Sequence, residues 1–407
     1  MLAKRHPVAA VPPPGASSLP GASWLAIGAI GAVWAALLGP IGAPHASADT
    51  GGGLEILREA PPSDRERYCA WFGQARDQVL YFGEAAFWTS FRARDRDPEA
   101  DLRITGPQRI GRVDLARERL LPPLDVTTPG ARSGVWDVLP HPNGRVYFST
   151  FYETAGWVDP ATGARARFGG LGTGIAELAL ATGGQLVAAR YGRPGHRHGS
   201  VVRFSPDGFL VREYPMRGSR RERVAPKSVA YDPVREEVWA LTDLLPAQGD
   251  GAIGHDARVL DRFGRERLRL RSPEIQFATF AEDGTGYLAE VEESALHLRI
   301  LAPGDAKDPI RRGRRLLLDA SFPAGFDFLQ DLQLAEDGRM VATRWSGWIH
   351  VVDPSAEVPV VTLQMPRIDD EGLYYTGVVR NGRLCATYCS DLVVACRDTA
   401  NAVRPSE

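Results

Sequence analysis

Carboxylate side chains recur at one position of a repeated sequence pattern, and this recurrence gives them the potential to form a site. Asp137, Glu177 and Asp331 each stand seven residues before the second residue of a short turn. Three hard oxygen ligands suit Ca²⁺ or Mg²⁺, and without a cation neighbouring carboxylates raise one another's pKa. The spacing predicts a metal or catalytic site. The alternative interpretation is that each carboxylate caps the backbone of a neighbouring repeat or pairs with an arginine.

A second set of polar residues stands six residues after the same turn position, and it includes Arg190, Glu290 and Arg344. Arginine binds carboxylate or phosphate through two parallel hydrogen bonds, so Arg190 and Arg344 are candidate contacts for an anionic ligand. Glu290 and Arg344 belong to consecutive repeats, where a buried pair of opposite charges can fix the register between neighbours. Ligand binding and structural pairing are the two interpretations of this set.

Two histidines, His196 and His198, form an H-x-H pair with the potential to bind a metal. The pair stands in a Gly-rich hairpin loop with no other His or Cys close in the sequence. We interpret the loop as solvated. His141 precedes a proline in a turn and is interpreted as structural.

Four cysteines are too few for a disulfide scaffold but enough for one or two bridges. Cys385 and Cys396 flank a tight hairpin at residues 390–391, and cross-strand neighbours lie close enough for a disulfide. Cys69, in the first repeat, would then reach Cys389 where the first and last repeats meet. This pairing is one of three possible connectivities.

The elements that must position these residues are seven copies of a β-hairpin. The second turn residues of the copies are Gln78, Gly144, Gly184, Glu236, Gly284, Gly338 and Gly382. The residues three and four positions later are apolar in every copy, which is typical of a strand buried on both faces. Asn-Gly and Asp-Gly turns are strong hairpin signals. The residues seven positions before the turn are Trp71, Asp137, Glu177, Val229, Phe277, Asp331 and Tyr375.

Repeats of about 50 residues with four short strands are typical of propeller blades. The seven copies predict an all-β, seven-bladed propeller, with a six-bladed ring as the alternative. The last copy shows only three strands, so we expect residues 54–57 to supply the fourth strand and close the ring. Closure removes exposed sheet edges. Innermost strands face a shared axis, so Asp137, Glu177 and Asp331 can converge there.

Each copy continues into a third strand that ends in a turn, as at Trp157 to Pro160 and Val351 to Pro354. The succession of inner strand, Asp-Gly or Asn-Gly turn, apolar strand and Val-Asp-Pro turn resembles NHL-like, streptogramin-lyase-like and gluconolactonase-like β-propellers. The resemblance covers most of the chain after residue 48 and lies in general blade motifs. It implies the propeller fold and, as an alternative function, a divalent-metal-dependent hydrolase or lyase.

The first 48 residues have the parts of a secretory signal peptide. Lys4 and Arg5 precede an apolar run from Ala22 to Gly39, and Ala46 to Ala48 form an A-x-A cleavage site. We expect residues 1–48 to be removed and residues 49–407 to form one propeller domain. The alternative is a membrane anchor at residues 22–39, since 18 residues can just span a bilayer. A periplasmic or secreted location follows, and it permits disulfides.

Charge and composition exclude several functions. The net charge is −2, with 48 basic and 50 acidic residues, so no strong positive field attracts nucleic acid. Only three of the basic residues are lysines, namely Lys4, Lys227 and Lys307, and the other 45 are arginines. We predict an exported propeller that binds a small molecule, or an envelope or extracellular protein, at its central channel. Contact with a membrane is expected only if the N-terminal segment is retained.

Overall fold

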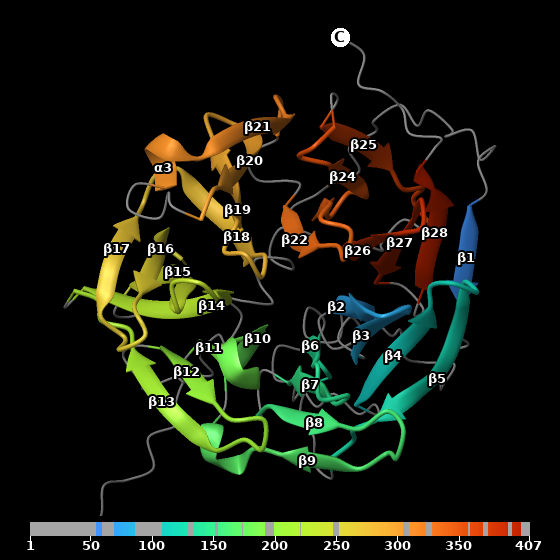
Figure 1. The fold of residues 1–407 in the computed structure, drawn as a ribbon, viewed down its shortest axis with the longest axis horizontal. Helices are drawn as coiled ribbons and strands as arrows, with labels where there is room; N and C mark the ends of the chain where they lie inside the picture. Colours follow the sequence, from blue (N-terminus) through green and yellow to red (C-terminus); the bar gives the residue numbers. More distant parts are fainter. Residues whose placement is uncertain are drawn as a thin grey trace, which may run out of the picture.

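The computed structural model describes residues 54–58, 69–85, 108–128, 134–150, 154–172, 174–191, 199–219, 221–246, 252–303, 309–322, 328–356, 359–368, 373–389 and 393–399. Seven four-stranded antiparallel sheets surround a central axis (Figure 1). This architecture is a seven-bladed β-propeller, which confirms the predicted fold over the six-bladed alternative.

Each blade places its first strand nearest the axis. Blades 1 to 3 are β2 (Cys69–Arg76), β3 (Val79–Ala85), β4 (Arg109–Asp114) and β5 (Arg119–Asp125); β6 (Asp137–Pro140), β7 (Val146–Ser149), β8 (Gly156–Val158) and β9 (Arg165–Arg167); and β10 (Ile175–Leu180), β11 (Leu186–Arg190), β12 (Ser200–Phe204) and β13 (Leu210–Pro215). Blades 4 to 6 are β14 (Glu222–Asp232), β15 (Glu237–Pro246), β16 (Gly254–Leu260) and β17 (Glu266–Leu270); β18 (Glu274–Phe280), β19 (Gly286–Glu292), β20 (Ala295–Leu301) and β21 (Arg314–Asp319); and β22 (Leu329–Leu334), β23 (Met340–Arg344), β24 (Trp348–Val352) and β25 (Val360–Gln364). Blade 7 is β26 (Tyr374–Arg380), β27 (Arg383–Tyr388), β28 (Val393–Asp398) and β1 (Glu55–Arg58). The short helices are η1 (Gly169–Leu171), η2 (Thr182–Gly184) and α3 (Pro309–Arg312).

The N-terminal strand closes the ring, as predicted. β1 pairs antiparallel with β28, and it is the fourth and outermost strand of blade 7. In Figure 1 the blue strand β1 lies directly beside the red strand β28. The strand spans Glu55–Arg58, one residue later than the expected span. The two ends of the described chain therefore share one sheet.

All seven predicted turns join the first and second strands of their blades. Gly144, Gly284 and Gly338 have φ values of 86°, 82° and 83°, in the left-handed region that favours glycine. Of the two copies without a turn glycine, the fourth has Glu236 at φ 53° in the equivalent position, whereas in the first the left-handed residue is Asp77, one position earlier, at φ 50°. A left-handed residue is thus present in the turn even where the sequence signature of the hairpin is weak.

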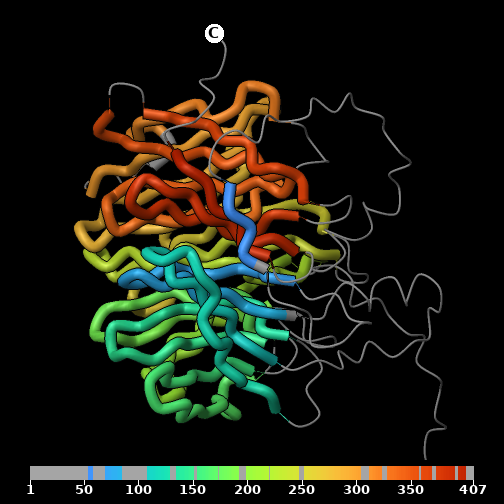
Figure 2. The backbone as a smooth tube through the Cα atoms, turned by 90° about the vertical axis from the view of Figure 1, so that its right-hand side faces the viewer, coloured from blue at the N-terminus to red at the C-terminus, as the bar shows by residue number. Residues whose placement is uncertain are grey.

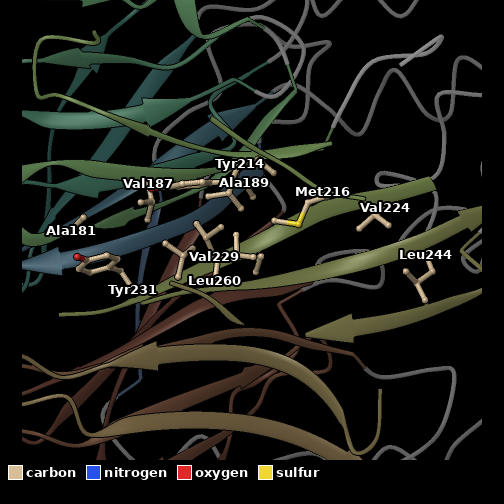
Figure 3. Packing of buried hydrophobic residues seen from close by; sticks show 14 residues of the cluster. Ala181, Val187, Ala189, Tyr214, Met216, Val224, Val229, Tyr231, Leu244 and Leu260 are labelled. Carbon is tan, nitrogen blue, oxygen red and sulfur yellow. The ribbon is translucent and has the colours of Figure 1, made fainter. Parts of the chain in front are cut away.

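The hydrophobic core lies between successive blades. Val187 and Ala189 of β11 in blade 3 pack against Val229 and Tyr231 of β14 in blade 4 (Figure 3). These side chains are the apolar residues that follow the hairpin turn and those of the next inner strand. The apolar positions of the repeat therefore bury one blade against the next and hold the inner strands around the axis.

The inner strands carry a repeated irregularity at one face of the ring. We call the face at which the innermost strands begin the start face. The pairing of first and second strands shifts register in six blades, between Ala70 and Gly73, Ile175 and Leu178, Pro226 and Ser228, Ile275 and Phe277, Leu329 and Asp331, and Tyr374 and Gly377. A bulge of this kind changes the direction of side chains and is common beside functional sites. Seen from the side, the strands run across the thickness of the ring (Figure 2).

Within the portion of the chain that the structure describes, no helix has the length and apolar character needed to cross a membrane. The predicted signal peptide at residues 1–48, with its alternative anchor at 22–39, lies outside that portion.

Candidate functional site

The predicted channel carboxylates lie on three inner strands, Asp137 on β6, Glu177 on β10 and Asp331 on β22. Asp137 and Asp331 are 5% and 7% exposed, and Glu177 is half-buried. The charges of the two aspartates affect the other carboxyl groups: Asp331 raises the pKa of Asp137, and both aspartates raise the pKa of Glu177. The ring therefore brings together residues that are up to 194 positions apart in the sequence.

Burial controls the ionisation of these carboxyl groups. Burial, and then the charge of Asp331, raises the pKa of Asp137 to about 7. Burial likewise raises the pKa of Asp331 to about 7. Burial, and then the charge of Asp137, raises the pKa of Glu177 well above its usual range. Asp137 and Asp331 therefore exchange protons near neutral pH, and all three pKa values are raised because desolvation disfavours the charged forms.

Two of the carboxyl groups accept hydrogen bonds from the next blade. The Leu178 N–H donates to Asp137 Oδ2 at 2.8 Å, and the Thr376 hydroxyl donates to Asp331 Oδ2 at 2.6 Å. Thr376 Oγ1 also accepts a hydrogen bond from Gly73 N at 3.0 Å. These bonds link blade 2 to blade 3, and blade 6 to blades 7 and 1. Asp137 thus caps the backbone of a neighbouring blade, as the alternative interpretation expected.

The Ca²⁺ or Mg²⁺ site at Asp137, Glu177 and Asp331 stays a prediction. Over the described ranges, no group of three or more His, Cys, Asp or Glu side chains is arranged to hold a metal ion. Asp137 and Asp331 direct oxygen atoms at donors of different neighbouring blades. We therefore derive no metal-dependent step from these three carboxylates.

Aromatic side chains of blades 7, 1 and 2 meet where the inner strands β26, β2 and β6 begin, on the start face. The ring centroid of Trp71 lies 5.0 Å from that of Trp136 and 4.9 Å from that of Tyr375. Phe72 lies 5.8 Å from Trp136 and 5.4 Å from Tyr375. Trp71 and Tyr375 are buried, whereas Phe72 and Trp136 are half-buried. We call these four residues the aromatic cluster. Its two buried rings hold two rings that remain partly accessible.

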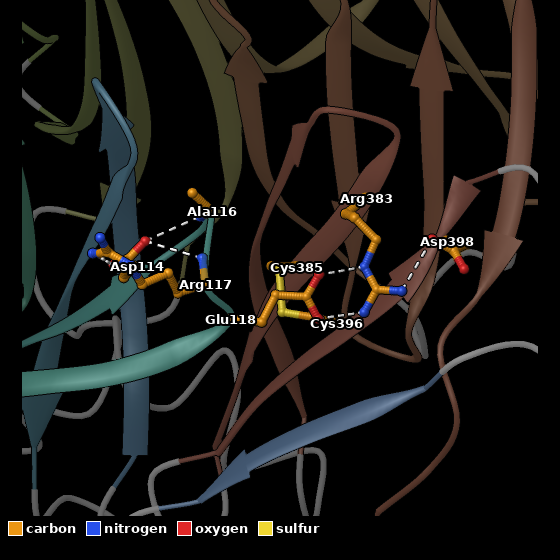
Figure 4. The surroundings of a disulfide bond; sticks show 8 residues. All are labelled: Asp114, Ala116, Arg117, Glu118, Arg383, Cys385, Cys396 and Asp398. Carbon is orange, nitrogen blue, oxygen red and sulfur yellow. Dashed lines mark hydrogen bonds and ion pairs between the residues drawn. A yellow bond between two sulfur atoms is a disulfide. The ribbon is translucent and has the colours of Figure 1, made fainter.

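The cysteines form the pairs Cys69–Cys389 and Cys385–Cys396, which is the predicted connectivity. Cys385 lies directly opposite Cys396 across β27 and β28. Cys69 begins β2 and Cys389 follows β27, so their disulfide joins blade 1 to blade 7. Both cysteines of this bridge pack with the aromatic cluster. In Figure 4 the other disulfide lies beside the ion pair that Arg383 forms with Glu118.

The arginines predicted to bind an anion each have a carboxylate partner. Arg190 pairs with Glu213 of its own blade, and its Nε donates to Ser200 Oγ at 2.8 Å. Arg344 pairs with Asp319 of β21, the last strand of the preceding blade. Arg344 therefore links blade 6 to blade 5, and both guanidinium groups contact negative charge that the chain itself supplies.

Glu290 and Arg344, whose opposite charges in consecutive repeats predicted an ion pair, have different partners. Glu290 is fully buried, and its Oε1 lies 2.7 Å from Arg299 Nη2 and 2.8 Å from Arg315 Nε. Both arginines belong to blade 5, as Glu290 does. The ion pairs of Glu290 thus hold together strands of one blade, and the connection between blades comes from Arg344 and Asp319.

Sequence reasoning missed a group of polar residues on blades 3, 4 and 5. The buried Asp243 Oδ1 lies 3.2 Å from Lys227 Nζ and 2.8 Å from His255 Nδ1. The Tyr191 hydroxyl lies 3.4 Å from Asp243 Oδ2, and His255 Nε2 lies 3.6 Å from Glu274 Oε1. We call these five residues the lysine cluster. The one signal in the sequence is the rarity of lysine.

Asp243 is the negative centre of the lysine cluster. Burial opposes its ionisation, but the positive charge of Lys227 and the hydrogen bond from His255 outweigh burial and lower the pKa of Asp243. Lys227 and Asp243 lie on β14 and β15, which at 11 and 10 residues extend further than the other strands of the described blades.

Of the other histidines singled out in the sequence, the structure describes only His141. His141 Nε2 lies 2.9 Å from Gly184 O of blade 3, and its Nδ1 accepts the Asn143 N–H at 3.0 Å. Both ring nitrogens thus make contacts between or within blades. His196 and His198 lie outside the described residues.

Comparison with known proteins supports the fold class that the blades define. No family model and no curated protein matches the chain. A structure of a catalytically inactive virginiamycin B lyase from Staphylococcus aureus with quinupristin aligns with a TM-score of 0.54, covering 84% of this chain and 99% of the lyase at 9% identity. The selenomethionine-substituted lyase from the same organism aligns with a TM-score of 0.56, covering 84% and 98% at 10% identity.

The class is therefore a seven-bladed β-propeller. Within this class the chain is similar in structure to streptogramin lyase. At 9–10% identity, the similarity concerns the fold alone.

Proposed function

We propose that this protein is an exported β-propeller that binds a small organic ligand on the start face, at the opening of its central channel. The aromatic cluster is the observation that carries the proposal. Its buried members, Trp71 and Tyr375, fix the orientation of the half-buried Phe72 and Trp136. Aromatic rings offer a large contact area in a defined geometry, and ligand sites combine such rings with few polar groups.

We infer that a positively charged ligand is preferred. The face of an aromatic ring attracts a cation. Asp137 and Asp331, with pKa values raised to about 7, lie on inner strands of the same ring. A bound cation would stabilise their ionised forms and release protons, because anything that favours the charged form lowers a carboxyl pKa.

Export is supported by the two disulfides. Disulfides form and persist in oxidising compartments and are rare in the cytosol. All four cysteines of the chain are paired, which agrees with the signal peptide predicted for residues 1–48.

The ligand preference is tested with benzyltrimethylammonium as the charged probe and benzyl alcohol as the neutral probe. The dissociation constant of each probe is measured by the quenching of tryptophan fluorescence. We expect the charged probe to bind at least ten times more tightly than the neutral probe. The Phe72→Ala variant should weaken that binding about tenfold, which is about 1.4 kcal/mol. Trp157→Ala is the control, since Trp157 lies on β8 and contacts Arg145 away from the cluster. Equal binding of both probes, or no effect of Phe72→Ala, contradicts the proposal.

Metal titration distinguishes the proposed ligand binding from the alternative function, a divalent-metal-dependent hydrolase or lyase. Adding Ca²⁺ or Mg²⁺ to chelator-treated protein should leave the thermal unfolding midpoint unchanged, because Asp137 and Asp331 are held by different neighbouring blades. A midpoint that rises with either ion, and that no longer rises in Asp137→Asn, would favour the metal-dependent enzyme, since a bound ligand stabilises the folded state.

A further inference from the structure

Two rings of the aromatic cluster, Trp71 and Phe72, stand in a bulge of β2. The pairing of β2 with β3 shifts between Ala70 and Gly73, so Trp71 and Phe72 together lie opposite the single residue Gly83. A bulge changes the direction of the side chains that it carries. The contacts that fix the backbone of this bulge therefore decide how the half-buried Phe72 ring is presented on the start face.

Two threonines of blade 7 hold the peptide groups on either side of Phe72. The Thr387 hydroxyl donates to Trp71 O at 3.0 Å, and the Thr376 hydroxyl accepts the Gly73 N–H at 3.0 Å. Thr387 Oγ1 also accepts the Thr376 N–H at 2.9 Å, so the two threonines are joined to each other. Both side chains are buried. Because a buried peptide group without a partner is costly, these hydrogen bonds specify the conformation of the bulge.

Asp331 sets the orientation of the Thr376 hydroxyl. That hydroxyl donates its one hydrogen to Asp331 Oδ2 at 2.6 Å, which leaves its oxygen as the acceptor for the Gly73 N–H. Blade 6 thus contributes through Asp331, blade 7 through Thr376, and blade 1 through the bulge. The three blades are connected at the residue next to Phe72.

The equivalent threonine of blade 6 makes no such connection. Thr343 stands five residues after Gly338, as Thr387 stands five residues after Gly382. Thr343 is also buried, but across the ranges that the structure describes its hydroxyl has no hydrogen-bond partner. The hydrogen bond to the inner strand of the next blade is therefore made by the threonine of blade 7 and not by that of blade 6.

We propose that Thr376 and Thr387 are positioning residues of the ligand site, which direct the Phe72 ring toward the ligand. This inference rests on the ligand binding proposed for the aromatic cluster, and it adds the residues that set the geometry of that site. Loss of either hydroxyl leaves a buried peptide group beside Phe72 without its partner. The bulge then adopts another conformation, and the ring no longer faces the ligand.

Thr376→Val tests the proposal, because valine has nearly the shape of threonine and lacks its hydroxyl. The dissociation constant of benzyltrimethylammonium, measured by the quenching of tryptophan fluorescence, should rise at least tenfold in Thr376→Val. It should stay within about twofold of the unmodified value in Thr376→Ser, which keeps the hydroxyl. Thr343→Val is the matched control and should leave the dissociation constant unchanged. An unchanged value in Thr376→Val, or an equal loss in Thr343→Val, overturns the proposal.

A double variant shows whether Thr376 acts through Phe72. In the Phe72→Ala background, adding Thr376→Val should weaken binding by less than about threefold, because the ring that the threonine positions is already absent. A further tenfold loss in that background would mean that the hydroxyl acts through the charge of Asp331, and it would overturn the role assigned to Phe72.

Near-UV circular dichroism of the ligand-free protein separates this proposal from the proposed ligand binding, since it measures the fixed packing of aromatic side chains. If the unmodified chain does not bind benzyltrimethylammonium, the proposed ligand fails, and the spectra still test the threonines. Thr376→Val should change the near-UV spectrum, whereas Thr376→Ser and Thr343→Val should not. An unchanged near-UV spectrum in Thr376→Val overturns the proposal. If that variant does not fold, Thr387→Val, which loses the hydrogen bond to Trp71 O, replaces it in each measurement.

Discussion

Replacing both Cys69 and Cys389 by alanine is expected to lower the free energy of unfolding by about 6 kcal/mol. The disulfide joins residues 320 positions apart, and a cross-link that closes a longer loop removes more entropy from the unfolded chain. This entropy loss occurs in the unfolded state, so the pairing of β1 with β28 in the folded ring does not replace it.

The matched control is the double variant Cys385→Ala and Cys396→Ala. That bridge spans only 11 positions, so the same relation gives about 3 kcal/mol. Denaturant unfolding without reductant measures both values. On heating, the midpoints should fall by roughly 8 °C and 4 °C, given the entropy of unfolding of a chain of this length. Equal losses for the two bridges would contradict the account of ring closure.

Asp137→Asn is expected to stabilise the protein by about 4 kcal/mol at pH 8, and by only about 1–2 kcal/mol at pH 5. The folded-state pKa of Asp137 is raised from 3.8 to about 7. Below pH 3.8 the group is protonated in both states. Between 3.8 and 7 the unfolded chain loses the proton first, so stability falls by about 1.4 kcal/mol per pH unit and stays low above pH 7. Asparagine removes this loss and keeps an oxygen for the Leu178 N–H.

Urea unfolding at pH 5 and pH 8 measures the effect. Asp207→Asn is the control, because Asp207 is an exposed turn carboxylate whose partner is Arg145, and its effect should be small at both pH values. If Asp137→Asn destabilises the protein equally at pH 5 and pH 8, the carboxylate is only a cap on blade 3. The expected result means that Asp137 reduces stability above neutral pH, which is typical of a group retained for binding.

The blade arrangement was predictable because it follows local patterns. Turn residues such as Asn143-Gly144 and the apolar pair that follows them specify a hairpin wherever they occur. The hairpin register placed Cys385 opposite Cys396, and the missing fourth strand of the last repeat identified β1. These inferences need only sequence spacing and the requirement that a ring has no free edge.

The site was less predictable because it depends on contacts between distant elements. Position in the repeat placed Trp71 and Tyr375 on inner strands, but their stacking requires blade 7 to meet blade 1. The register shifts of the inner strands have no residue signature in this chain. Asp319 reaches Arg344 from the end of β21, where the repeat predicted Glu290 as the partner.

The lysine cluster shows the same limit. Lys227, Asp243 and His255 come from three strands of blade 4, while Tyr191 and Glu274 come from the blades on either side. Their meeting follows from the extra length of β14 and β15. Only the presence of a lysine among so many arginines distinguished Lys227 in the sequence.

Binding at the channel opening is tested most directly by calorimetry of benzyltrimethylammonium at pH 7, in two buffers with different ionisation enthalpies. We predict that binding releases protons, because the cation favours ionised Asp137 and Asp331, whose pKa values are raised to about 7. We also predict that Trp136→Ala weakens binding at least tenfold. Binding without proton release, at an affinity that Trp136→Ala leaves unchanged, would contradict a cation site at the aromatic cluster.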